Sequence, residues 1–199
     1  GYFFGFHDHS PFSHDNNKLL ANRPVGDLYM PTKNDALEVG FFEGDSYEEF
    51  VPVSKSFAWN WHMGCKLQWR GKKNEIIFND CSHGKYISRI INIDTKEEFS
   101  LSDSISSVSL DGKWAVGYSF ARLNKLMPGY GYINPVIDKD IDIRKPNSGI
   151  YRINLEDGAK KNIISTEKLA SINPIKSMNK ADHFLTHTIF SPDSSKFIF

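Results

Sequence analysis

The segment Ser-Val-Ser-Leu-Asp-Gly-Lys-Trp-Ala-Val at 107–116 sets the pattern of the chain: a short apolar strand, a tight polar turn and a second apolar strand. Its central Asp-Gly pair is typical of a β-hairpin, because glycine readily adopts the positive φ that such turns need. The same template recurs at 11–20, 67–78 and 189–199. Recurrence at this spacing predicts a fold built from repeated hairpins.

A second hairpin pattern follows two of these units, at 86–96 and 149–158, and a looser copy follows the first unit at 36–42. Each alternates apolar and polar residues and ends in an acidic turn, as half-buried strands do. Two hairpins in series make a four-stranded antiparallel blade, so we predict an all-β fold, a β-propeller. A β-sandwich whose hairpins are similar by accident is the alternative.

The predicted repeat divides the chain into blade units of one partial propeller domain, at about 1–58, 59–102, 103–176 and an incomplete 177–199. The chain would thus be a fragment of about three and a half blades, with further blades expected beyond Phe199. One short helix is expected near 166–172.

Composition excludes some partners. The 199 residues hold 24 Lys+Arg and 24 Asp+Glu, and this zero net charge argues against a general electrostatic grip on nucleic acid or on an anionic membrane. No apolar run is long enough to span a bilayer, and no signal-peptide pattern opens the chain. The cysteines Cys65 and Cys81 fit a reducing compartment better than a disulfide framework. We therefore expect a cytoplasmic protein.

The segments at 108–114 and 190–199 resemble the repeat of TolB-type propellers, a WD40-like class. The segments at 2–6, 59–69, 77–80 and 128–132 resemble a bacterial family of uncharacterised proteins with this fold. A more distant likeness is to oligogalacturonate lyase, a cytoplasmic propeller enzyme that holds a metal with histidines and a glutamine. That second likeness implies a fold rather than an activity.

The repeat also sorts the loops onto two rims. The short polar turns within hairpins lie on one rim, and the connections at 22–35, 80–85 and 121–148 lie on the other. The last of these carries an acidic stretch from Asp138 to Asp142. Long loops in compact domains often carry function. The candidate ligand-binding residues on or near this rim are Asn60, Trp61, Gln68, Asn79, Asp80, Arg122, Tyr130 and Tyr132. The tyrosines can present rings to a saccharide or pack the loop onto its own rim, and Asn79-Asp80 is also ordinary turn chemistry.

The histidines show a regular spacing. His9 and His187 each lie three residues before the apolar residue that precedes a hairpin turn, and His62 and His183 each lie seven before theirs. Equivalent offsets place these side chains near the starts of the innermost strands. Convergent imidazoles suit a divalent transition metal, so His62, His183 and His187 are candidate ligands, with Gln68, Asn60 or Asp8 completing the shell. The alternative is that the ring nitrogens satisfy buried carbonyls.

Three functions remain open from the sequence. The first is a binding module that holds a saccharide or glycoconjugate on its loop-rich rim, and the second is a protein–protein scaffold. The third is a metal-dependent lyase like oligogalacturonate lyase, in which the metal binds a uronate carboxylate, a base removes the adjacent proton, and Arg122 neutralises the substrate. The sequence contains no complete catalytic set, so catalysis is undecided.

Overall fold

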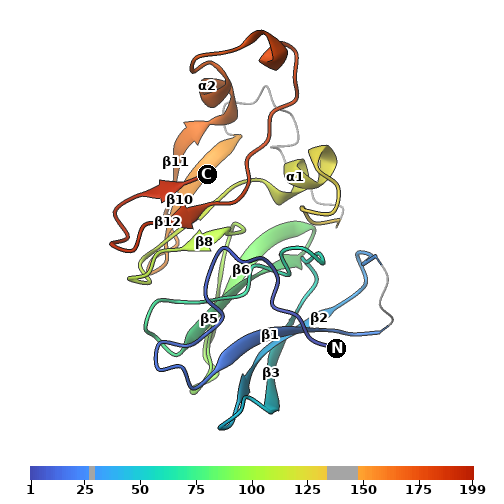
Figure 1. The fold of residues 1–199 in the computed structure, drawn as a ribbon, viewed down its shortest axis with the longest axis vertical. Coiled ribbons are helices and arrows are strands. Elements are labelled where there is room, and N and C mark those ends of the chain that lie inside the picture. Colours follow the sequence, from blue (N-terminus) through green and yellow to red (C-terminus); the bar gives the residue numbers. More distant parts are fainter. Residues whose placement is uncertain (27–29, 134–147) are drawn as a thin grey trace.

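The structure is a computed structural model that describes residues 1–26, 30–133 and 148–199 (Figure 1). The acidic stretch from Asp138 to Asp142 lies outside these residues. Two sheets have four antiparallel strands each, in chain order. One contains β4 (Gln68–Trp69), β5 (Glu75–Ser82), β6 (Lys85–Asn92) and β7 (Glu98–Leu101). The other contains β8 (Ser107–Val108), β9 (Trp114–Gly117), β10 (Gly149–Asn154) and β11 (Lys160–Ser165).

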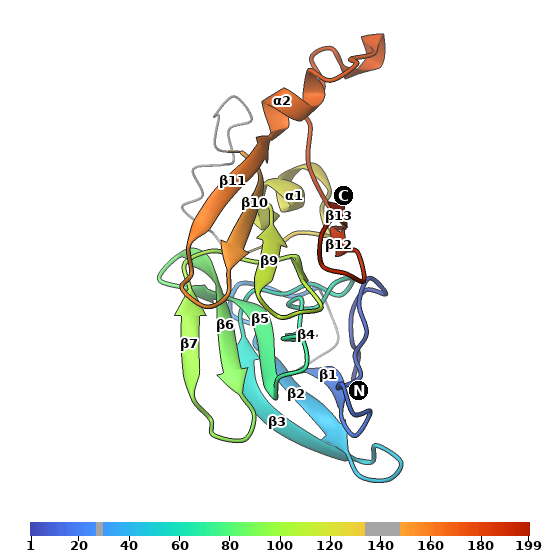
Figure 2. The ribbon, with the colours of Figure 1, turned by 90° about the vertical axis from the view of Figure 1, so that its left-hand side faces the viewer.

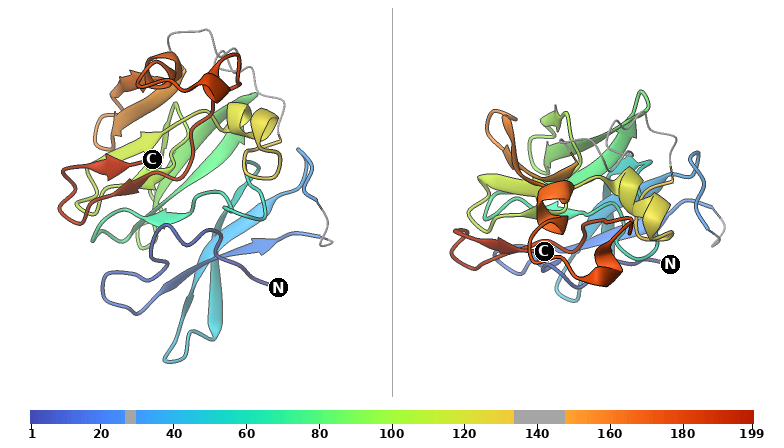
Figure 3. Two further views of the ribbon diagram at one scale, coloured as in Figure 1. Left: turned by 45° about the horizontal axis from the view of Figure 1, so that its top comes forward. Right: turned by 90° about the horizontal axis from the view of Figure 1, so that it is seen from above.

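The first sheet contains β1 (Leu19–Pro24), β2 (Leu37–Glu43) and β3 (Glu49–Ser56). Its innermost strand is reduced to the bridge between Phe12 and Leu19, since Pro11 has no N–H to extend the ladder. The C-terminal hairpin contains β12 (Ile189–Phe190) and β13 (Phe197–Ile198), and further views place it beside the third sheet (Figure 3). The all-β class and the four-stranded antiparallel unit are confirmed, and each sheet falls within one of the four predicted units. Closure into a propeller ring stays a prediction.

A repeated side-chain contact explains why the predicted turns form. The serine hydroxyl donates to the carboxylate two residues later in Ser13–Asp15, Ser109–Asp111 and Ser191–Asp193, at 2.7, 2.6 and 2.6 Å. The same carboxylates accept main-chain N–H groups two residues further on, which closes each turn. The second unit has Arg70 in place of the serine, and its buried guanidinium donates to the Gly112 carbonyl at 2.9 Å. Arg70 therefore joins the turns of two neighbouring sheets.

The core lies between successive sheets, which follow one another along the molecule (Figure 2). Because side chains alternate along a strand, Ile76 and Phe78 of β5 pack with the first sheet, whereas Ile77 packs with the third. Both faces of β5 are buried, which accounts for its continuous apolar run.

Three local features bear on the sequence-based expectations. The predicted helix near 166–172 is confirmed as α2 (Thr166–Ala170), and a short turn of helix, η2 (Lys176–Met178), follows it. The prediction of a loop from residue 121 was wrong at its start, since α1 (Phe120–Leu126) begins there, with Ser119 accepting from the Arg122 N–H at 3.0 Å. The predicted loop at 80–85 was also wrong: β5 and β6 pair as far as Ser82 and Lys85, leaving only His83-Gly84 as a turn with positive φ at both residues.

Within the described part of the chain, no helix is both long and apolar enough to cross a membrane. Cys65 and Cys81 are free thiols.

Candidate functional site at the inner strands

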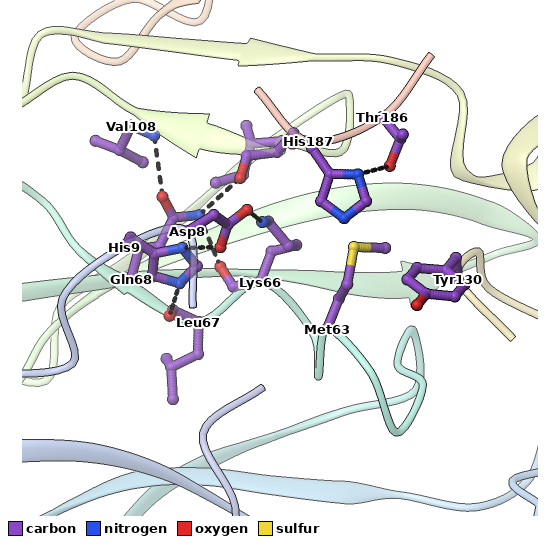
Figure 4. Close-up of polar contacts among 12 residues, drawn as sticks. Asp8, His9, Met63, Lys66, Leu67, Gln68, Val108, Tyr130, Thr186 and His187 are labelled. Carbon is purple, nitrogen blue, oxygen red and sulfur yellow. Dashed lines mark hydrogen bonds and ion pairs between the residues drawn. The ribbon is translucent and has the colours of Figure 1, made fainter. Parts of the chain in front are cut away.

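The segments that lead into the innermost strands meet in a group of polar side chains (Figure 4). The first segment contributes Asp8 and His9, the second Lys66, and the last His187. The third segment, which contains Ser106 and Val108, is connected to this group by Gln68 of the second unit. The Gln68 side-chain amide donates to the Ser106 carbonyl and accepts from the Val108 N–H. The equivalent starts of several repeats are therefore brought to one place.

The Lys66–Asp8 ion pair is the most deeply buried part of the site. The Lys66 ammonium lies 2.5 Å from Asp8 Oδ2, and the two side chains are 0% and 2% exposed. On the other side of the carboxylate, His9 Nδ1 lies 2.6 Å from Asp8 Oδ1, while His9 Nε2 lies 3.1 Å from the Leu67 carbonyl oxygen. Burial opposes ionisation of Asp8, but His9 and Lys66 together hold its pKa well below the ordinary value. Asp8 therefore stays ionised as the partner of Lys66.

Lys66 and His187 occupy the same position in their units, three residues before the reference residues Trp69 and Phe190. Both have a left-handed backbone, with φ of 56° and 55°. Residues other than glycine adopt this conformation rarely and at a cost, and such positions cluster at functional sites. His9 shares the same offset. The repeat thus presents chemically active side chains from equivalent positions.

Five rings form a continuous ring band next to the ion pair. Successive ring centroids are 4.2, 4.6, 6.1 and 4.4 Å apart along His7, Phe6, His187, Tyr130 and His62. The imidazole of His62 lies parallel to the Tyr130 ring, with an interplanar angle of 5°. His7 and His62 at the two ends are exposed, and the three rings between them are half-buried.

Two glycines allow the band to form. A side chain at Gly5 would lie 2.9 Å from the Met63 main chain, so glycine lets the Phe6 segment approach the Met63 loop. A side chain at Gly131 would lie 2.2 Å from the main chain of α1, so glycine lets the Tyr130 loop pack on this helix.

Three buried polar atoms beside the ion pair make no hydrogen bond of normal geometry with the described residues: Ser106 Oγ, the Tyr118 hydroxyl and His187 Nε2. The Tyr118 hydroxyl faces Ser106, Thr186 and the His187 main chain, and burial raises its pKa. Burial likewise lowers the pKa of His187, whose Nδ1 lies 2.9 Å from Thr186 Oγ1. Unsatisfied buried polar atoms are costly, and a cluster of them indicates a place for water or ligand atoms.

Among the residues predicted to bind a ligand, Asn60, Gln68, Asn79 and Asp80 are buried connectors. The Asn60 amide donates to the carbonyls of Tyr130 and Gly131, both at 3.2 Å, and so anchors the loop that carries the band. Asn79 bonds the main chain of Ile105 with both its amide nitrogen and its oxygen, at 2.7 Å each. Asp80 accepts from the Phe57 N–H and pairs with Arg89.

The other predicted residues divide between the core and the band. Trp61 packs against Phe3 and Trp59. Tyr132 is buried, stacks on Phe120 and bonds the Asn79 amide through its hydroxyl. Arg122 donates two N–H groups to the His183 carbonyl. Tyr130 alone of these belongs to the ring band, and the ligand-binding role of all eight stays a prediction.

Of the three predicted metal ligands, His62 and His187 lie on either side of Tyr130. His183 lies instead in a groove beside α2 and η2, with Glu167 and Met178. Across residues 1–26, 30–133 and 148–199, no three His, Cys, Asp or Glu side chains are grouped so as to hold a metal ion. The metal site thus stays a prediction to which this geometry adds no support.

Sequence reasoning missed Lys66, Phe6, Ser106 and Tyr118. The signal for Lys66 was present, because it has the same offset from its hairpin as His9 and His187. Tyr118 and Ser106 lie close together only after folding, so no local pattern marks them.

Comparisons with known proteins show distant structural likeness. No family model matches the chain, and no curated protein matches it. Among solved structures, the AtxE2 isopeptidase in its apo form is 10% identical with a TM-score of 0.49, over 82% of this chain and 30% of that one. An oligogalacturonate lyase in complex with manganese is 11% identical with a TM-score of 0.39, over 94% of this chain and 60% of that one. The chain thus spans less than two thirds of either protein. These likenesses assign it no activity or substrate.

Proposed function

We propose that this protein is a propeller-type binding module that holds a saccharide, free or as part of a glycoconjugate, on the ring band. The observation that carries the proposal is the juxtaposition of the band with the unpartnered polar atoms of Ser106, Tyr118 and His187. Sugars present an apolar face of C–H groups and a periphery of hydroxyls. They are therefore recognised where aromatic faces lie next to a few converging polar groups.

The half-buried centre of the band supports this reading. Phe6, His187 and Tyr130 are held by ring contacts and by the Asn60 bonds, so little side-chain entropy remains to be lost on binding. The exposed ends at His7 and His62 leave the band accessible from solvent.

The test is a screen of the purified protein against an oligosaccharide panel, followed by calorimetric titration of each sugar that binds. Truncation of Tyr130 to alanine removes one of the three half-buried rings of the band and should weaken binding about 3- to 10-fold. Tyr2→Ala is the matched control, because the Tyr2 ring is also partly exposed but contacts Phe42 and Phe50 instead of the band. Equal losses in the two variants, or no saccharide binding at all, would contradict the proposal.

A protein–protein scaffold is the alternative binding function. It predicts that single truncations in the band leave partner binding nearly unchanged, since a flat protein surface spreads its contacts over many side chains. The lyase alternative predicts turnover of an acidic oligosaccharide that depends on added metal.

A further inference from the structure

The charged side chains next to the ring band, Lys66 and Asp8, bear on whether the site suits a neutral or an acidic saccharide. Lys66 is a cation close enough to act on His187, and its charge is already compensated by Asp8, 2.5 Å away. A second cation, Arg122, donates to the His183 carbonyl. A ligand carboxylate entering here would meet the ionised Asp8, and of the described cations Lys66 and Arg122 are already engaged.

The unpartnered atoms instead match hydroxyl groups. The Ser106 and Tyr118 hydroxyls can each donate and accept a hydrogen bond, and His187 Nε2 donates or accepts according to its tautomer. A sugar hydroxyl has the same dual character, whereas a carboxylate only accepts. Mixed donors and acceptors around a neutralised pair therefore suit an uncharged polyol.

We propose that Ser106, Tyr118 and His187, lying beside the neutralised Lys66–Asp8 pair, form a subsite that selects uncharged saccharides over uronates. This inference rests on the proposed function and narrows it. The subsite is the inner-strand end of the site, and a hydroxyl of the bound sugar supplies the hydrogen bonds that these three atoms lack.

The first experiment compares matched ligands: neutral hexose oligosaccharides and their counterparts oxidised to uronates at C6. The neutral member of each pair should bind at least about 10-fold more tightly, because a carboxylate buried next to Asp8 is uncompensated. The dissociation constant of the neutral sugar should also stay unchanged when salt is raised from about 50 to about 500 mM. Tighter binding of the uronate, still weakened by Tyr130→Ala, would overturn this inference but leave the proposed function standing. Absence of all saccharide binding would overturn both.

The second experiment replaces one tyrosine at a time by phenylalanine, which removes the hydroxyl and keeps the ring. Tyr118→Phe should weaken the neutral sugar about 3- to 10-fold, while the melting temperature of the free protein does not fall. Tyr151→Phe is the matched control: Tyr151 in β10 is also buried, but its hydroxyl donates to the Ser104 carbonyl at 2.7 Å. That control should lose stability and keep its affinity. Unchanged affinity in Tyr118→Phe would contradict the subsite.

Discussion

The Lys66 ammonium and the Asp8 carboxylate lie 2.5 Å apart, although 58 residues separate them in the chain. Both side chains are almost completely shielded from water. An isolated buried charge is far more costly than a buried pair, so the two residues are expected to be strongly coupled in stability.

A double-mutant cycle measures this coupling. Asp8→Asn leaves the ammonium of Lys66 unpaired and should lower the free energy of unfolding by about 3–5 kcal/mol. Lys66→Met leaves the Asp8 carboxylate without its ammonium partner, with only His9 beside it, and should also be destabilising. The double variant should recover much of the loss, because neither charge is then stranded. Denaturant unfolding of the four proteins gives the coupling energy, and simple additivity of the two single losses would show that the pair does not interact as described.

Acid unfolding tests the ionisation of Asp8. Above about pH 4, the ordinary pKa of an aspartate, its carboxyl is ionised in both the folded and unfolded states. Its pKa is lowered in the folded protein, so below that pH the unfolded chain takes up a proton that the folded protein does not. Stability is then lost as the pH falls, by up to about 1.4 kcal/mol per pH unit from this group. In Asp8→Asn the fall between about pH 4 and about pH 2 should be shallower. Parallel stability curves for the two proteins would rule out the lowered pKa.

Asn79 provides a test of how the second and third sheets are joined. Its side chain bonds both main-chain groups of Ile105, as well as the hydroxyls of Ser88 and Tyr132. Asn79→Ala leaves several of these buried partners unsatisfied and should cost about 3 kcal/mol. The exposed Asn17→Ala should change stability by less than about 0.5 kcal/mol. Thermal or urea unfolding distinguishes the two, and equal small effects would mean that the Asn79 contacts contribute little.

Tyr118→Phe tests the unpartnered hydroxyl independently of any ligand. Within the described residues this hydroxyl makes no hydrogen bond of normal geometry, so its removal should leave stability unchanged or raise it by up to about 1 kcal/mol. A clear loss, as large as in Tyr151→Phe, would show that an internal bond holds the Tyr118 hydroxyl.

The hairpins were predictable from sequence because their signals are local. The Ser-x-Asp and Asp-Gly turns at 13–15, 109–112 and 191–193 carry their own hydrogen-bonding partners within a few residues. Helix α1 escaped prediction because it is short and its clearest signal is a single cap, Ser119. The predicted ring closure needs contacts that the described residues do not supply.

The candidate site was only partly predictable for a different reason. The equivalence of His9 and His187 could be read from spacing, and Tyr130 from its loop. The burial of Lys66 could not be predicted, because a lysine is usually exposed. Its burial depends on the ion pair with Asp8, which is distant in the sequence. Asn79 and Gln68 have side chains of the kind that bind ligands, yet their amides donate hydrogen bonds to the main chain of the next unit.

The most direct test of the central claim is a histidine-resolved NMR titration of the protein with a neutral oligosaccharide that binds. The ring signals of His7, His62 and His187, which belong to the band, should shift together with ligand concentration. Those of His14 and His83, which are exposed on hairpin turns and make none of the ring contacts of the band, should stay in place. Shifts confined to His14 or His83, with the band histidines unchanged in the presence of bound sugar, would contradict the account.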